Sequence, residues 1–221
     1  MKRILSCCLI LAIGLAMSGC GVITKTTSAS AMEDVSAEDY FSKISSAGGE
    51  YELARQSGVL EKDWREYTVK LNSVVLTLPC SVTYLEGVGL KMDTSFMAAD
   101  SLVNYGNRES VYFENGRGDA ILVTLMNPDR KPKALSECLV TGIAVTNLDL
   151  CGGYLTVTFP GEIELGSHKS DAIIAYGSDY EEYQSEAVHM YTWHDPNSYY
   201  KSCEIDYDAE TLEASGMFLN Y

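Results

Sequence analysis

Positive charge is scarce in this sequence. Its 221 residues include 16 Lys and Arg against 31 Asp and Glu, which gives a formal net charge of −15 at pH 7. A protein that binds nucleic acid uses Lys and Arg to neutralise backbone phosphates, whereas a strongly negative chain repels them. The composition therefore excludes DNA and RNA as partners.

The usual signatures of metal and catalytic sites are also missing. No pair of cysteines has the Cys-x-x-Cys spacing of a zinc site, and no Gly-x-Ser-x-Gly motif marks a nucleophile. There are three histidines, and His189 and His194 are five residues apart in or beside a predicted strand, so they point to opposite faces. We expect His194 at a turn or rim, and we predict no cofactor and no catalytic residue.

One acidic pattern has two interpretations. Glu204, Asp206 and Asp208 alternate with apolar residues, so in a strand the three carboxylates share one face. Such a face could attract calcium, or it could simply be the solvated side of a strand whose other side is buried. The chain has no EF-hand-like loop with its glycine here, which favours the solvated face over a metal site.

The N-terminus has the features of an export signal. Two basic residues precede a continuous apolar run over residues 4–17, which fits a secretory signal and is too short to span a bilayer comfortably. The run ends in Met-Ser-Gly-Cys, which resembles the lipobox of bacterial lipoproteins. That resemblance implies cleavage after residues 1–19 and attachment of diacylglycerol to the Cys20 thiol. The alternative is an ordinary cleaved signal followed by an incidental cysteine.

Cleavage would leave a strongly acidic chain on a tether. It removes two basic residues and no acidic ones, which leaves 14 basic and 31 acidic residues and a net charge of −17. Residues 20–37 begin with the lipidated cysteine and are rich in Ser, Thr and Ala, as in a flexible linker. Residues 38–66 are a helical or partly ordered lead segment. We therefore expect a lipid-anchored protein on the extracytoplasmic face of the cell membrane.

An apolar run, a short helix and a closing glycine occur twice in the rest of the chain. Residues 161–177 (GEIELGSHKSDAIIAYG) show this order clearly, and residues 76–89 (LTLPCSVTYLEGVG) are a weaker copy. Short alternating strands separated by turn residues follow each copy. We therefore predict an α+β fold of two tandem helix-plus-antiparallel-meander units, residues 67–150 and 151–221.

The local signals inside these units are specific. We expect helices over residues 81–87 and 167–176 on the same face of the sheets, with Ser167 as the N-cap of the second helix. An Asn-Ser turn predicts a hairpin from residues 67–71 and 74–78. A three-stranded meander is predicted over residues 187–193, 199–207 and 212–220. An Arg-Gly-Asp tripeptide at residues 117–119 falls at an expected hairpin tip, where its glycine already has a turn to explain it.

The helix-then-meander order resembles the architecture of β-lactamase inhibitor protein. The LGSHKSDAIIAYG run is similar to the opening of the small SmpA/OmlA-type assembly lipoproteins. The pair LPC at residues 78–80 and ECLVTGI at residues 137–143 also resembles a group of lipoproteins from Gram-positive gut bacteria. These resemblances imply a surface location and protein binding, and they imply no catalytic residues.

The cysteines of the mature chain allow several states. After signal cleavage and lipidation, Cys80, Cys138, Cys151 and Cys203 remain. In an exported chain they could form disulfides, of which Cys80–Cys138 and Cys151–Cys203 are the favoured pairs. The alternative is four free thiols, buried like other small apolar side chains.

Aromatic residues are concentrated near the C-terminus, where eight of the fifteen tyrosines follow residue 175. Tyrosine and tryptophan beside carboxylates are favoured at interfaces. We therefore predict that Tyr191, Trp193 and Tyr200 contribute to a binding face on an open side of the sheet, for a protein or glycan partner. The alternative is that Tyr191 and Trp193 belong to the core.

Two classes of function remain from the sequence. The first is a non-catalytic binding or assembly lipoprotein at the cell envelope. The second is an envelope hydrolase whose site cannot be read from the sequence. The missing nucleophile, metal and phosphate-loop motifs favour the binding lipoprotein.

Overall fold

The computed structural model describes Ala54 and residues 56–221. The predicted signal peptide, the predicted lipidation site Cys20, the predicted tether and most of the lead segment lie outside the described residues. Of that lead segment, the described part contains one 3₁₀ turn, η2 (Trp64–Glu66), and no α-helix. None of the helices in the described part is long and apolar enough to cross a membrane.

Strands dominate the described part of the chain. In chain order they are β1 (Thr68–Leu71), β2 (Val74–Thr77), β3 (Cys80–Ser81), β4 (Lys91–Met92), β5 (Leu102–Val103), β6 (Arg108–Glu114), β7 (Ala120–Met126), β8 (Lys133–Ala134), β9 (Leu139–Thr146), β10 (Val157–Thr158), β11 (Glu181–Gln184), β12 (Val188–Asp195), β13 (Ser198–Asp208) and β14 (Ala214–Asn220). The helical elements besides η2 are α2 (Val82–Gly87), η3 (Leu135–Glu137), η4 (Pro160–Glu162) and α3 (Lys169–Tyr176).

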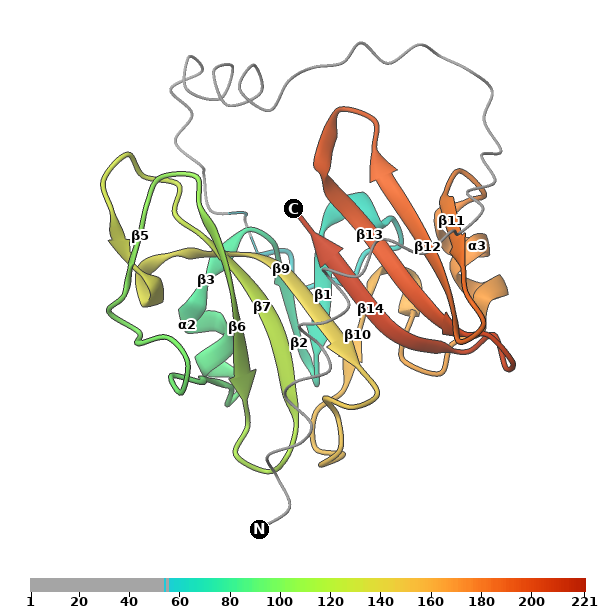
Figure 1. The fold of residues 1–221 in the computed structure, drawn as a ribbon, viewed down its shortest axis with the longest axis horizontal. Coiled ribbons are helices and arrows are strands. Elements are labelled where there is room, and N and C mark those ends of the chain that lie inside the picture. The colour runs from blue at the N-terminus through green and yellow to red at the C-terminus, as the bar shows by residue number, and fades with distance from the viewer. Residues whose placement is uncertain (1–53, 55) are drawn as a thin grey trace.

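Nine of these strands form one antiparallel sheet. Its order is β11-β12-β13-β14-β9-β7-β6-β4, and β3 pairs separately with β9. Strand β9 lies in the middle, where Ala144 is paired with Leu122 of β7 on one side and with Phe218 of β14 on the other. Figure 1 shows this sheet running across the whole molecule. A second sheet has the order β10-β1-β2, and β5 pairs with β8.

The predicted α+β fold of two tandem units is therefore wrong. The protein is mostly β-sheet, and the proposed boundary at residue 150 divides neither main sheet. Strand β9 from the first predicted unit pairs with β14 from the second, and β1 pairs with β10 in the same way. The physical reason is the composition of β9, whose side chains are apolar or small on both faces. Such a strand favours a central position in a sheet, with a paired strand on each side, over a position at the end of a unit.

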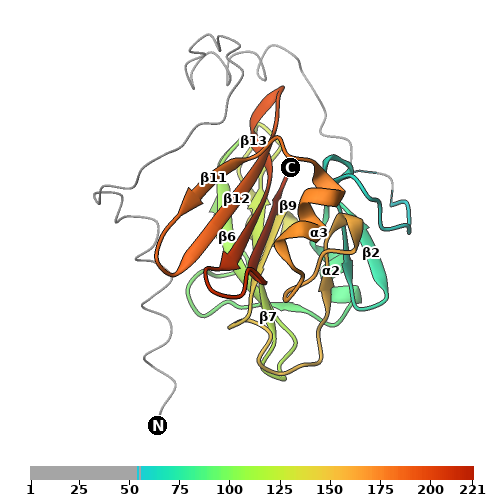
Figure 2. The same ribbon diagram turned by 90° about the vertical axis from the view of Figure 1, so that its right-hand side faces the viewer.

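The core lies on one side of the large sheet. Figure 2 shows α2, α3 and β2 together on that side, as the sequence predicted for the two helices. Alternation in the strands supplies the apolar face: Ile121, Val123 and Leu125 of β7 are fully buried, while the residues between them are half-buried on the other face. Leu85 of α2 and Ala172 of α3 are fully buried against this face. The sheet therefore has one covered face and one face that α2 and α3 leave free.

Most of the local predictions are confirmed, with one change at α3. The hairpin of β1 and β2 turns at Asn72, which has a positive φ of 54°. Helix α3 is capped by His168 and Asp171 in a capping box, whereas Ser167 was the predicted cap. The Ser167 hydroxyl instead accepts a hydrogen bond from the Glu164 main-chain N–H at 2.9 Å. Ser167 thereby closes the turn before the helix.

Candidate functional site

The structure places Tyr191 and Trp193 in the core. Their exposed fractions are 0% and 2%, because α3 covers the face of β12 on which both side chains lie. The Trp193 indole donates a hydrogen bond to the Gly177 main-chain oxygen at 3.0 Å, and its ring packs edge-on against Tyr176. The predicted binding face is therefore wrong for these two residues, and the alternative of a core position holds.

Tyr200 differs from the other two predicted binding residues. Its side chain is 38% exposed, and the Arg108 guanidinium lies 5.6 Å from the centre of its ring. It lies close to the start of β13, near the hairpin that joins β12 to β13. Tyr200 is thus the one predicted binding-face residue that presents an aromatic ring to the surface.

A polar chain fixes β11 to the core. The Lys169 ammonium donates to the Tyr191 hydroxyl at 2.6 Å, and that hydroxyl in turn donates to a carboxylate oxygen of Glu182. Burial would raise the pKa of Glu182, but hydrogen bonds from Tyr191 and Gln184 outweigh it and hold the pKa below its usual range. Burial, together with the Glu182 carboxylate, raises the pKa of Tyr191. A charged hydrogen-bonded chain therefore connects the first turn of α3, the middle of β12 and β11.

Two acidic side chains lie on the face of the sheet opposite to α3, on a strand that β12 separates from β11. Glu204 and Asp206 of β13 lie there, and Thr192 of β12 donates to Glu204 at 3.2 Å. Burial raises the pKa of Glu204, and burial with the neighbouring Glu204 charge raises the pKa of Asp206 to about 7. Asp208 is separate, because it accepts hydrogen bonds from main-chain N–H groups of the following turn. The described residues contain no cluster of His, Cys, Asp and Glu that could hold a metal ion.

The three histidines lie in three different environments. His168 caps α3, and the His194 Nε2 atom lies 3.7 Å from a carboxylate oxygen of Glu181. His189 is paired with Tyr207 across β12 and β13, and its Nδ1 is buried without a hydrogen-bond partner in the described part of the chain. His189 and His194 lie on opposite faces of β12, as predicted. The His168 Nδ1 atom lies 2.9 Å from the Ser170 hydroxyl, within the first turn of α3.

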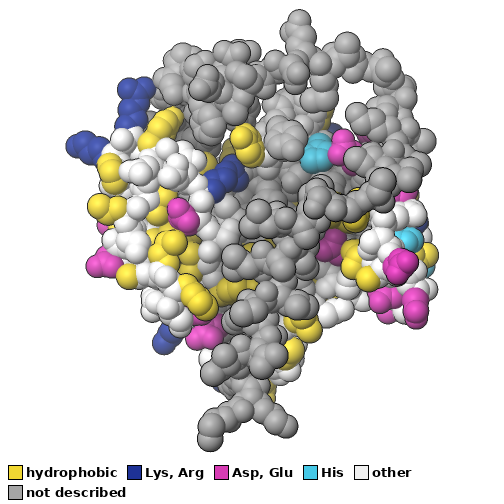
Figure 3. All heavy atoms as spheres, in the orientation of Figure 1, with side chains coloured by type: hydrophobic (Ala, Val, Ile, Leu, Met, Phe, Trp, Pro, Cys, Tyr) yellow, Lys and Arg dark blue, Asp and Glu magenta, His cyan; other side chains and the backbone are white. Residues whose placement is uncertain are grey.

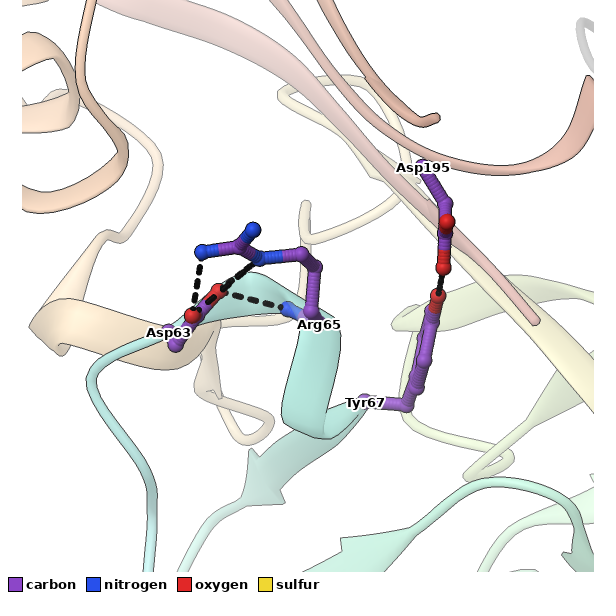
Figure 4. Close-up of polar contacts among 4 residues, drawn as sticks. All are labelled: Asp63, Arg65, Tyr67 and Asp195. Atoms are coloured by element: carbon purple, nitrogen blue, oxygen red, sulfur yellow. Dashed lines mark hydrogen bonds and ion pairs between the residues drawn. The ribbon is translucent and has the colours of Figure 1, made fainter. Parts of the chain in front are cut away.

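The hairpin of β12 and β13 is anchored at its tip. The Tyr67 hydroxyl donates to Asp195 at 3.4 Å, while Arg65 pairs with Asp63 at 2.7 Å within the preceding turn (Figure 4). Burial, and then the Asp195 charge, raises the pKa of Tyr67. The Lys201 ammonium lies 5.3 Å from the Tyr67 ring centre. These contacts hold the long hairpin against η2 and keep its strands in place.

The Arg-Gly-Asp tripeptide has a structural role. Asp119 is fully buried, and its carboxylate accepts main-chain N–H groups of Gly152, Gly153 and Tyr154 at 2.6 to 2.8 Å, as well as the Asn115 amide. Burial would raise the pKa of Asp119, but these hydrogen bonds hold it below its usual range. An adhesion motif needs an accessible carboxylate, whereas the Asp119 carboxylate is buried and accepts hydrogen bonds inside the protein.

The four described cysteines are free thiols, so neither predicted disulfide is formed, and the alternative of buried free thiols holds for all of them except Cys151. Cys80, Cys138 and Cys203 are buried, and Cys151 is exposed in the loop after β9. Cys203 lies in the centre of β13 opposite Leu219, where a partner on a surface loop does not reach it. Burial raises the pKa of Cys80 to about 12, so this thiol is unreactive in the folded state.

The edges of the sheets differ in how they are protected. The outer edge of β2 is partly closed by the side chain of Gln56, whose amide bonds both the N–H and the C=O of Thr77. Strand β4 at one end of the large sheet has only two residues. Strand β11 at the other end has four residues, and no described segment pairs with its outer side. The sequence predictions missed this strand, since Glu and Gln have low strand propensity.

Comparisons with known proteins returned nothing: no family model, no curated protein and no solved structure matches this chain. The resemblance to assembly lipoproteins therefore remains a prediction, whereas the architecture of β-lactamase inhibitor protein, predicted from two helix-plus-meander units, is wrong for this mostly β-sheet fold.

Proposed function

We propose that this protein is a non-catalytic binding lipoprotein of the cell envelope. The lipid on Cys20 holds it on the extracytoplasmic face of the membrane, and its folded part binds a partner protein. The observation that carries the proposal is the rigidly held acidic end of the large sheet, made by β11 and the free faces of β12 and β13. A fixed, charged surface of this kind favours specific association with a complementary partner.

The positions of the reactive groups support a binding function. The histidines cap a helix, pair with a surface carboxylate or lie beside Tyr207, and three of the four free thiols are buried. On the face drawn in Figure 3, Lys and Arg side chains lie in the half of the molecule that carries β5, while Asp and Glu side chains are seen at both ends. The acidic side chains below β12 and β13 would attract a basic partner as it approaches.

Cross-linking in membranes tests this function. Whole cells that express the full chain are treated with a short amine-reactive cross-linker, and the chain is recovered and its adducts identified. We expect one protein partner in stoichiometric amount, and the same partner with the purified chain in solution. The outcome that overturns the proposal is turnover of an ester, peptide or glycan substrate that a single substitution abolishes. That result would establish the envelope hydrolase instead.

A further inference from the structure

We propose that the outer edge of β11 binds an extended polypeptide segment rich in Lys and Arg, which joins the nine-stranded sheet as an additional strand. This inference rests on the proposed binding function and names the site and the chemistry of the partner. Main-chain hydrogen bonds to an exposed sheet edge supply affinity in this mode of recognition, and the flanking side chains supply specificity.

The hydrogen-bond pattern shows which groups β11 offers. The Ser185 N–H donates to the Val188 oxygen at 2.9 Å, which makes these two residues a hydrogen-bonded pair at the hairpin turn. Bonded and non-bonded pairs alternate along an antiparallel ladder, so Tyr183 and Glu181 bond to β12. The N–H and C=O groups of Glu182 and Gln184 therefore face away from the sheet. Outside the ladder, none of the main-chain hydrogen bonds of the described residues uses these four groups.

The charge on this edge selects a basic partner. Residues 177–187 contain four acidic residues and no Lys or Arg. The Glu181 side chain is 79% exposed on the free face, 3.7 Å from the His194 Nε2 atom, and Glu182 lies on the other face of the same strand. An added strand would place alternate side chains on the free face, next to the Glu181 carboxylate. Lys or Arg at alternate positions would therefore meet a negative charge, whereas the Glu182 carboxylate on the other face is already bonded to Tyr191 and lies near the Lys169 ammonium.

The same charges disfavour pairing between two copies of this chain. Two β11 edges brought together would place Glu181 and Glu182 of one copy beside the glutamates of the other, and like charges directly opposite destabilise a strand pair. Natural sheet edges are usually protected by Lys, Pro, bulges or extreme shortness. Strand β11 has none of the first three, whereas Gln56 covers part of β2 and β4 is very short. Negative charge thus protects the β11 edge against unwanted strand pairing, and a basic segment would neutralise that charge.

The edge is already in the conformation that a partner needs. Glu182 is held by Tyr191, and Tyr183 is paired with Met190, so β11 is ordered before a partner arrives. Tyr180, just before β11, packs edge-on against Tyr191 with ring centres 4.7 Å apart. Preorganisation of this kind reduces the entropy cost of binding. Tyr183, which is 39% exposed, adds an aromatic contact beside the new strand.

A proline substitution tests the edge without breaking the ladder. Gln184→Pro removes an N–H that faces outward, so it should block strand addition and leave the pairing with β12 intact. Gln184→Ala is the matched control, because it removes the same side chain and keeps the N–H. The probe is a fluorescent peptide of alternating Lys and Thr, about ten residues long, with a Glu-for-Lys peptide as its negative control. Its affinity for the full chain is measured by anisotropy.

We expect the basic peptide to bind the wild-type chain and Gln184→Ala equally, and Gln184→Pro at least about tenfold more weakly. Glu181→Gln should also weaken binding, while Glu114→Gln, at the other end of the same sheet, should not. Affinity should fall as the ionic strength rises from about 0.05 M to about 0.5 M. Amide hydrogen exchange should slow at Glu182 and Gln184 when the peptide binds.

Several results would overturn the inference. These are equal peptide affinity of Gln184→Pro and Gln184→Ala, protection at amides other than those of β11, or no binding of the basic peptide. Self-association of the wild-type chain that Gln184→Pro abolishes would assign the edge to a second copy. If Gln184→Pro unfolds, the peptide affinity of Glu181→Gln and the hydrogen-exchange pattern of the wild-type chain test the edge site instead. A membrane partner that still cross-links to folded Gln184→Pro would refute the edge site and leave the proposed binding function standing.

Discussion

The carboxylate of Asp119 accepts a hydrogen bond from the Gly152 main-chain N–H at 2.6 Å, although the two residues are 33 positions apart. Asp119 precedes β7, and Gly152 lies in the loop after β9, so one buried side chain joins a hairpin tip to a distant loop. Gly152 has no room for a side chain, since an added Cβ would come within 2.5 Å of the Arg117 main-chain oxygen. The loop and the tripeptide therefore form a single packed unit.

Asp119→Ala should destabilise the protein by about 3 kcal/mol, because three main-chain N–H groups would lose a charged acceptor. Urea unfolding of the purified chain measures this change. Arg117→Ala is the control from the same tripeptide, and its surface contact with Tyr154 predicts an effect below about 1 kcal/mol. Equal stabilities of the two variants would show that the buried carboxylate does not hold the loop.

Trp193→Ala and Tyr200→Ala should separate core from surface. Removal of the buried indole should cost about 3–5 kcal/mol and lower the melting temperature sharply. The exposed Tyr200 ring should contribute far less, since it keeps contact with water and with Arg108. Calorimetry on both variants gives the comparison. A similar melting temperature for Trp193→Ala and the wild-type chain would contradict the burial of this side chain.

Asp206 should make stability depend on pH. Its folded pKa of about 7 lies above the unfolded value of about 3.9, so the folded chain holds an extra proton between these limits. Stability contributed by this group is complete below pH 4 and is lost as the pH rises toward 7, by up to about 1.4 kcal/mol per pH unit. Asp206→Asn should remove this slope in urea unfolding from pH 4.5 to 7.5, a range chosen as roughly the window between the two pKa values.

The neighbours of Asp206 provide the control for this dependence. Glu204 lies on the same face of β13 and raises the pKa of Asp206, while Gly216 and Met190 flank it on the adjoining strands. Glu204→Gln should therefore lower the pKa of Asp206 and shift the slope to lower pH. An unchanged pH profile in Asp206→Asn would mean that its carboxyl is ionised throughout the window.

Thiol titration should distinguish Cys151 from Cys80, Cys138 and Cys203. In the native chain Cys151 should react with a thiol reagent, since it is exposed. Cys80, Cys138 and Cys203 should react only after unfolding, because burial both blocks access and raises the pKa of their thiols. Cys151→Ser measures the background reaction of the native chain with the thiol reagent when the exposed thiol is absent. Failure of Cys80 and Cys138 to react after unfolding, until a reductant is added, would indicate a disulfide.

Cys20→Ser should block lipid attachment. Cells that express the wild-type chain with an alkyne fatty acid should label the protein, and the variant should accumulate as an unlabelled precursor or a secreted form. Cys151→Ser is the matched control, since it changes a different cysteine, exposed in the loop after β9, and should keep the label. Labelling that persists in Cys20→Ser would refute the lipid anchor.

Local patterns in the sequence determined much of this structure. The Asn72-Ser73 turn located the first hairpin, and Gly177 marked the end of α3. These features depend on backbone conformation within a few residues, which the local sequence controls. The apolar leader and the cysteine that follows it belong to the same kind of evidence.

Only the tertiary structure decided which strands pair and which faces are covered. Alternation shows that Tyr191 and Trp193 share a face, but the position of α3 decides that this face is buried. In the same way, the sequence of β9 allows it to be the last strand of one unit or a strand shared by both predicted units. The pairing of Ala144 with Phe218 shows that β9 connects the two predicted units in one sheet. The edge at Glu181–Gln184 exists because β12 takes up one side of that segment and nothing in the described chain takes the other. These outcomes depend on contacts between residues far apart in the chain, which carry no signature in any local pattern of residues.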